Sequence, residues 1–181
     1  GLNHDFGQER EGTDRSGLEL PWRQPELIKR VAAANPRTVV VLVAGAAVTM
    51  EPWLDSVPSV LLAGYPGMEG GAAIAHVLFG KMNPSGKLPY TFPKRLTDSS
   101  AHVGADPRRY PGVGGKVWYE EGLMVGYRWF DAEKIEPLFP FGHGLSYTRF
   151  DYNALRVLEG QGAALATVEV DVTNAGQRRG A

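Results

Sequence analysis

An unbroken apolar run, TVVVLVA at residues 38–44, is the feature that most constrains the fold of this chain. A strand with one solvated face alternates apolar and polar side chains, whereas no polar residue interrupts the stretch from Val39 to Ala44. Such a strand is typical of a parallel sheet that helices cover on both faces. We therefore predict a buried strand over residues 38–44 and an α/β domain built around it.

The neighbouring segments alternate between helix and strand, as such a domain requires. Apolar residues recur at helical spacing over residues 22–35, and Pro36 predicts the end of that helix because the residue before a proline disfavours the α region. A second buried strand is predicted at residues 59–64, a second helix at 71–79 and a short extended segment at 88–92. This order predicts an open α/β sandwich with α/β/α layers.

The remainder of the chain has a different pattern. Residues 93–137 are rich in Pro, Gly, Asp and Arg and predict a long loop that aromatic segments interrupt. Residues 151–157 and 166–173 alternate apolar and polar side chains, which is the period of half-buried antiparallel strands. A domain boundary is therefore expected near residue 150. The predicted domains are an α/β sandwich over residues 1–150 and the beginning of a β-sandwich over residues 151–181.

Composition argues against several classes of function. With 19 Lys+Arg against 20 Asp+Glu the net charge is -1, which argues against a protein that binds nucleic acid through a basic face. The absence of cysteine excludes a disulfide framework, a thiol nucleophile and a cysteine-ligated zinc site. No apolar run reaches the roughly 18 residues of a membrane span, and no signal peptide pattern is present. The four histidines are scattered, so we expect no metal and no other cofactor.

Three other motifs have structural interpretations that we favour. The glycine-rich turn at residues 67–71 precedes a predicted helix, but it matches neither a dinucleotide fingerprint nor a P-loop, so we interpret its glycines as allowing close packing. Ser85 lies in an Asn-Pro-Ser-Gly turn and in no nucleophile elbow. The aromatic segments at 117–119 and 127–130 suit either stacking on a sugar or packing between domains, and we favour packing.

The segment EREGTDR at residues 9–15 is the strongest candidate for acid–base chemistry. It places three carboxylates and two guanidinium groups on a loop between regular elements. A carboxyl that donates a proton near neutral pH needs a pKa raised by burial or by a neighbouring charge. From the residues alone a solvated run of charges is the simpler interpretation, and a catalytic carboxyl is the alternative.

Four strings, taken together, resemble glycoside hydrolase family three, the group of β-glucosidases and β-xylosidases. Three of them are similar to successive blocks of the second domain of that family, and the last is similar to the opening of the fibronectin type III-like domain that follows in many members. They occur in the order of the family, and the resemblance extends over essentially the whole chain. The strings are YPGMEGGAAIAHVLFGKMNPSGKLPYTFP at 65–93, VWYEEGLMVGYRWFD at 117–131, EPLFPFGHGLSYTRF at 136–150 and VEVDVTNAGQRRGA at 168–181.

The resemblance implies a retaining glycosidase of the β-glucosidase type, which removes terminal non-reducing β-linked sugars. In that family a (β/α)8 barrel comes first and carries an aspartate nucleophile, and a loop of the α/β sandwich lends the general acid/base glutamate. The family motif around this glutamate reads E-G-aromatic-D-R and matches residues 11–15, with Thr13 in place of the aromatic residue. The resemblance therefore implies that Glu11 is the acid/base, and Glu9 remains the alternative two residues away.

These implications lead us to expect a C-terminal fragment that is inactive alone because its nucleophile lies in the missing barrel. Its expected partners are a carbohydrate substrate and the N-terminal barrel of the same protein, with no cofactor, nucleic acid or membrane. The alternatives are a non-catalytic carbohydrate-binding or interaction module on the same fold, and a family member specific for xylose, arabinose or deoxysugars. The sequence leaves the sugar, the linkage, the compartment and the oligomeric state open.

Overall fold

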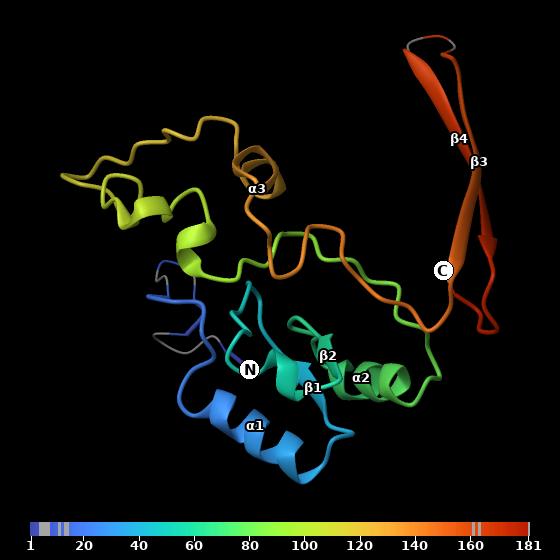
Figure 1. Cartoon of the computed structure of the whole chain (residues 1–181), viewed down its shortest axis with the longest axis horizontal. Helices are drawn as coiled ribbons and strands as arrows, with labels where there is room; N and C mark the ends of the chain where they lie inside the picture. The colour runs from blue at the N-terminus through green and yellow to red at the C-terminus, as the bar shows by residue number, and fades with distance from the viewer. Residues whose placement is uncertain (4–7, 11, 13–14, 161, 163, 181) are drawn as a thin grey trace. The chain divides into compact units, whose positions relative to one another are not determined.

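The computed structural model describes residues 1–3, 8–10, 12, 15–160, 162 and 164–180. By their internal contacts the residues form two compact units, which are described separately here. The first unit comprises residues 1–71 and 88–143, and the second comprises residues 72–87 and 144–181. Helices and strands occur in both units, so the chain has the mixed α/β composition that the sequence predicts (Figure 1).

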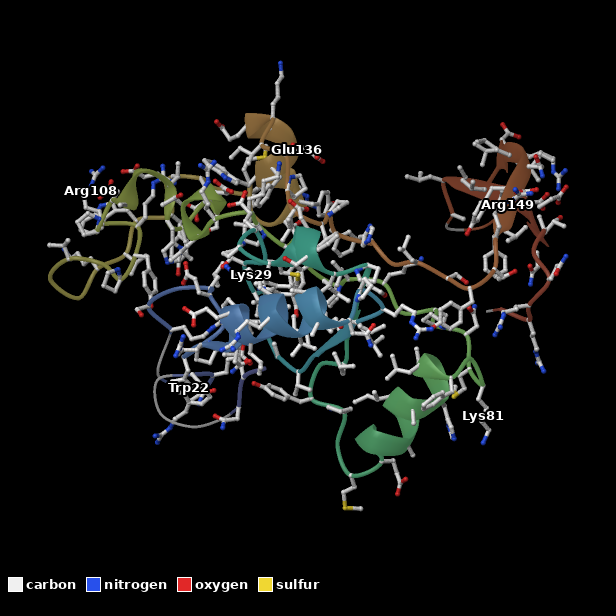
Figure 2. All side chains as sticks on the ribbon, turned by 60° about the horizontal axis from the view of Figure 1, so that its bottom comes forward. Trp22, Lys29, Lys81, Arg108, Glu136 and Arg149 are labelled. Atoms are coloured by element: carbon white, nitrogen blue, oxygen red, sulfur yellow. The ribbon has the colours of Figure 1, made fainter. Side chains whose placement is uncertain are left out.

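The first unit begins with helix α1 (Gln24–Ala34), within the predicted range. Pro25 lies in its first turn, where a missing N–H leaves no helical hydrogen bond unmade. The helix ends at Ala34, and its C-cap Asn35 has the extended backbone conformation that a residue before a proline prefers. Trp22 lies just before the helix with 76% of its surface exposed (Figure 2). Proline therefore marks both ends of α1, as the sequence indicates.

Strands β1 (Val39–Leu42) and β2 (Ser59–Leu62) pair in parallel. The register sets Val39 opposite Ser59 and Leu42 opposite Leu62, and Figure 1 shows the two strands side by side. The parallel pairing confirms the prediction, but the expected burial along the whole strand is wrong. Val39 is 43% exposed and Leu42 only 1%, because within the described residues this sheet has two strands and the fully buried part of the core lies at its carboxyl end.

The core of the first unit lies around the chain that follows β1. Ile28 of α1 packs against this core, together with side chains of β2 and of the segments near residues 90 and 139. A short 3-10 turn, η1 (Leu54–Ser56), leads from the core into β2. The buried members of the core are Leu2, Leu20, Leu42, Ala44, Val48, Met50, Trp53 and Phe92. The most deeply buried part of the unit is therefore the carboxyl edge of β1 and the segment that leaves it.

Two segments of the first unit differ from expectation. Residues 88–92 form no regular strand and make one antiparallel bridge, between Phe92 and Phe139, because Pro89 has no N–H to offer a ladder. The expected long loop contains the 3-10 turns η2 (Leu96–Asp98) and η3 (Val103–Ala105) and the helix α3 (Tyr127–Glu133). Helix α3 buries Trp129 and Phe130, which agrees with packing as the use of this aromatic segment.

The second unit contains most of helix α2 (Gly70–Leu78) and the strands β3 (Phe150–Glu159) and β4 (Ala166–Asn174). The two strands form an antiparallel hairpin, drawn in orange and red in Figure 1. This pairing confirms the antiparallel strands that the alternating sequence pattern predicts. Its valines are not half-buried, since Val168 is 64% exposed and Val172 53%. The side chain of Asn83 joins the segment after α2 to the segment that precedes β3, because its Oδ1 accepts the N–H of Tyr147 at 2.7 Å.

Candidate active-site loop

The candidate site lies at the carboxyl edge of the β1–β2 pair. The last residues of the two strands, Leu42 and Leu62, are partners in the parallel register, so both strands end at the same edge. Gly45 and Tyr65 each lie three residues beyond these ends. In open α/β sheets this edge is where ligands ordinarily bind. Glu9 and Arg15, which precede both strands in the chain, contact the backbone at this edge.

Glu9 makes the main connection between this segment and the sheet. Its Oε2 accepts the backbone N–H of Gly45 at 2.7 Å, and its Oε1 accepts the backbone N–H of Ala46 at 3.0 Å. The hydroxyl of Tyr65 donates a short hydrogen bond to the same Oε2. The Glu9 side chain is 11% exposed, and its backbone N–H donates to the carbonyl of Asn3 at 3.0 Å. Both carboxylate oxygens are thus hydrogen-bonded to segments that leave β1 and β2.

Arg15 ties the other end of the loop to the same place. Its Nη2 donates to the carbonyl oxygen of Ala47 at 2.7 Å and lies 3.6 Å from Glu9 Oε1. The Arg15 side chain is 10% exposed, so this ion pair is largely removed from water. The loop from Glu9 to Arg15 is therefore fastened at both ends to residues 45–47.

Gly45 permits this arrangement because the space beside it is filled. A Cβ at this position would lie 2.6 Å from Cε2 of Tyr65 and 3.2 Å from Oε2 of Glu9. The first distance is shorter than any ordinary contact between carbon atoms. Glycine here serves the close approach of Tyr65 and Glu9 to the backbone.

The negative charge of Glu9 helps to raise the pKa values of two nearby tyrosines. Burial of its hydroxyl end and the hydrogen bond to Glu9 raise the pKa of Tyr65 to about 12. Burial and the negative charge of Glu9 also raise the pKa of Tyr90, whose hydroxyl donates to the carbonyl of Gly45 at 3.3 Å. Both phenols remain protonated near neutral pH and act there as hydrogen-bond donors.

Of the two carboxylates that the sequence suggests as the acid/base, only one belongs to the described residues. Glu9 lies in the cluster just described, whereas Glu11 falls outside the described residues, as do Thr13 and Asp14 of its motif. Sequence reasoning did not include Gly45 or Tyr65 in the site. Their positions in the sequence could have indicated them, because each follows a predicted strand and therefore lies at the edge where α/β folds place their sites.

Other sequence candidates are accounted for by local structure. Gly67 has a φ of +70° and its carbonyl accepts the N–H of Gly70 at 3.2 Å, so the glycine-rich segment is a turn that opens α2. No group of three potential metal ligands occurs among the residues that the structure describes. Over the same residues, no helix combines the length and apolar character needed to cross a membrane.

Comparison with known proteins identifies the family. The model of the glycosyl hydrolase family 3 C-terminal domain matches residues 2–147. The chain belongs to glycosyl hydrolase family 3. This family 3 chain is 54% identical over 171 residues to a β-glucosidase of Rhizobium radiobacter, covering 94% of the chain and 21% of that protein. It is 46% identical over 153 residues to the β-glucosidase BoGH3A of Bacteroides ovatus, covering 84% of the chain and 20% of the relative.

Solved β-glucosidase structures agree with this assignment and with the mixed α/β fold. DesR, a β-glucosidase from Streptomyces venezuelae solved in complex with D-glucose, superposes with a TM-score of 0.86 at 48% identity, over 93% of this chain and 21% of that one. β-Glucosidase 3B from Thermotoga neapolitana superposes with a TM-score of 0.83 at 37% identity, over 94% and 24% of the two chains. The chain thus spans about a fifth of the length of the relatives that it matches.

Proposed function

We propose that this family 3 chain is the C-terminal part of a retaining β-glucosidase, in which Glu11 is the general acid/base and an aspartate of an N-terminal barrel is the nucleophile. In the first step the Glu11 carboxyl gives its proton to the leaving glycosidic oxygen while the aspartate bonds to the anomeric carbon. In the second step the Glu11 carboxylate takes a proton from the water that releases the sugar. The two carboxyls act about 5–5.5 Å apart in such enzymes.

The observation that carries this proposal is the relation between the chain and the β-glucosidases. Nearly all of the chain matches a protein of that name at 54% identity, yet covers only 21% of it. A domain shared at this level, within proteins of one activity, is expected to serve the same reaction. The remaining length of the relatives leaves ample room for the barrel that the proposal requires.

The choice of Glu11 over Glu9 is supported by what the Glu9 carboxylate contacts. A general acid must present a carboxyl to the leaving oxygen of the substrate. Both oxygens of Glu9 accept hydrogen bonds from the protein, and its side chain is 11% exposed. In the sequence Glu11 lies between Glu9 and Arg15, at the position that the E-G-x-D-R motif assigns to the acid/base. The proposed partners are accordingly a β-linked carbohydrate and the barrel domain.

We also propose that residues 151–181 begin a fibronectin type III-like domain that follows the α/β domain of residues 1–150. The proposal is supported by the family model, which ends at residue 147, and by the antiparallel pairing of β3 and β4 beyond it. Exposed valines on β4 are consistent with a sheet face that the rest of a β-sandwich covers.

The test is Glu11→Ala in the full-length hydrolase, with Glu133→Ala, an exposed carboxylate at the end of α3, as control. Loss of the acid slows glycosylation most for substrates whose leaving group needs a proton, so kcat/KM should fall by about 10²–10⁴ for these and far less for activated aryl glucosides. Azide should restore turnover of the activated substrates and yield a glycosyl azide. The isolated 181-residue chain should hydrolyse neither substrate.

Unchanged kinetics in Glu11→Ala would show that this residue is not the acid/base. Turnover by the isolated chain would contradict the proposal that the nucleophile lies in the barrel. A full-length protein without any barrel would favour the carbohydrate-binding or interaction module instead.

A further inference from the structure

We infer that Glu9 is a positioning residue for the acid/base: its carboxylate fastens the loop of residues 9–15 to the carboxyl edge of the β1–β2 sheet and so sets the place of Glu11. This inference rests on the proposed function of Glu11. It assigns Glu9 a role of its own, distinct from proton transfer.

The first step is the way in which Glu9 joins two segments of the sheet edge. The backbone N–H groups of Gly45 and Ala46 point to Oε2 and Oε1, at 2.7 and 3.0 Å. The Tyr65 hydroxyl reaches Oε2 from the segment after β2. One carboxylate is therefore held by the continuations of both strands, and a carboxylate accepts such a set of donors because it has two oxygens and about four lone-pair sites.

The second step is that the loop is fastened twice. Arg15 donates to the carbonyl of Ala47 at 2.7 Å and pairs with Glu9 at 3.6 Å, while its side chain is 10% exposed. Between these two anchors lie five residues, 10–14, with Glu11 near one end. Fixing both ends of a short loop in general lowers the number of conformations that the loop can adopt.

The third step is the location of the anchors. Ala44, immediately before the residues that hold Glu9, is 1% exposed, and Val48, just beyond those that hold Arg15, is 0% exposed. The loop is thus attached to well-packed backbone on both sides.

The fourth step is that catalysis requires an accurately placed acid/base carboxyl. A displacement of about 1 Å by a mutation away from the reacting atoms can lower the rate about 10²-fold. A glutamate on a short loop depends on the attachment of that loop for its position. Loss of the Glu9 carboxylate is therefore expected to impair proton transfer while the Glu11 carboxyl is still present.

The experiment compares Glu9→Gln, Tyr65→Phe and Glu133→Gln in the full-length hydrolase, and adds Glu9→Ala for a test of rescue by azide. Glu9→Gln keeps the size of the side chain but replaces one acceptor oxygen by an NH2 group, which faces a backbone N–H that it cannot bond. Tyr65→Phe removes a single donor from the cluster, and Glu133→Gln makes the same chemical change at an exposed site on α3. For each variant, kcat/KM is measured with a poor and with an activated leaving group, and hydrogen exchange is measured over residues 8–15.

We expect Glu9→Gln to lower the poor-to-activated ratio of kcat/KM about 10- to 100-fold and to speed exchange over residues 8–15. Tyr65→Phe should give a smaller change of the same kind, and Glu133→Gln should match the wild type. The ratio is informative because a variant that merely folds less well loses activity equally with both substrates. Azide should not rescue Glu9→Ala, since its acid/base carboxyl remains in place.

An unchanged ratio together with unchanged exchange in Glu9→Gln would overturn the inference. Azide rescue of Glu9→Ala, with formation of a glycosyl azide, would also overturn it and would make Glu9 the acid/base itself. Failure of the proposed function has a different signature. In that case Glu11→Ala leaves the kinetics unchanged, whatever the exchange behaviour of the Glu9 variants.

Discussion

Trp129 donates its indole N–H to the backbone carbonyl of Asp98 at 3.0 Å, a buried hydrogen bond between α3 and η2. The two residues are 31 positions apart, so the bond closes a long irregular segment of the first unit. Trp129 is 8% exposed and lies beside Phe130, which is 6% exposed. The short helix α3 thus holds the loop region by burying two aromatic rings and satisfying one buried carbonyl.

Trp129→Phe should destabilise the protein by roughly 2–4 kcal/mol. The change leaves the Asp98 carbonyl without its donor, at a cost of about 1–3 kcal/mol, and adds the loss of packed ring volume. Urea unfolding measures the effect as a lower midpoint with an unchanged slope. A stability equal to that of the wild type would mean that this hydrogen bond is not buried in solution.

Arg109→Met tests the ionic cluster in the same loop region. Arg109 pairs with Glu120 at 3.2 Å and with Glu121 at 3.3 Å, and the Glu121 side chain is only 6% exposed. Removing the guanidinium leaves a buried carboxylate unpaired, so we expect a loss of roughly 3–5 kcal/mol in the free energy of unfolding.

Arg108→Met is the matched control for that change. Arg108 pairs with Asp106 and Glu120, but its side chain is 52% exposed (Figure 2). Exposed ion pairs contribute little to stability, so the control should unfold close to the wild type. Equal losses in the two variants would contradict the burial of the Arg109–Glu121 pair.

Gly45→Ala should destabilise the protein by roughly 1–3 kcal/mol, because the added methyl group would lie 2.6 Å from the Tyr65 ring. Gly71→Ala is the matched control in helix α2, where nothing lies within 4 Å of an added Cβ. The control should gain about 0.4–1 kcal/mol, since alanine favours the helix. Thermal unfolding should therefore move in opposite directions for these two variants, and a common direction would refute the packing described around Gly45.

The pKa of Tyr65 predicts how stability depends on alkaline pH. Its pKa is raised from the ordinary value of 10.0 to about 12 in the folded protein, so the folded state holds the proton more tightly than the unfolded state. The resulting stabilisation is complete below pH 10 and is lost as the pH rises through 12. Unfolding measured from pH 9 to 12 should show a steeper loss in the wild type than in Tyr65→Phe. Parallel curves would contradict the assigned shift.

Much of the fold follows from the sequence, because regular elements leave periodic patterns. The helices near residues 24–34 and 70–78, the parallel strands and the antiparallel pair all lie where apolar spacing and proline predict them. Helix α3 was not predicted, since its seven residues are too few for a clear period and its aromatic side chains suit several structures. The exposure of Val39 was also missed, because burial depends on neighbouring elements that one strand does not encode.

The candidate site was predictable only in part. The charge run of residues 9–15 was evident, but its attachment to Gly45 and Tyr65 crosses 36 and 56 positions of sequence. Contacts over such distances leave no local pattern. They follow from the parallel register, which brings the segments after β1 and β2 to one edge.

The parallel register of β1 and β2 also determines whether the contact between Tyr65 and Glu9 can form. Strands β1 and β2 are four residues long each, and their pairing decides which residues meet beyond Leu42 and Leu62. A slip by one residue would carry Tyr65 about 3.3 Å along the edge and turn its side chain to the opposite face, out of reach of Glu9. The four-residue pairing of β1 and β2 therefore determines how accurately Tyr65 and Glu9 are placed relative to each other. Any substitution that weakens this pairing is expected to disturb their contact, even when the substituted residue lies far from both.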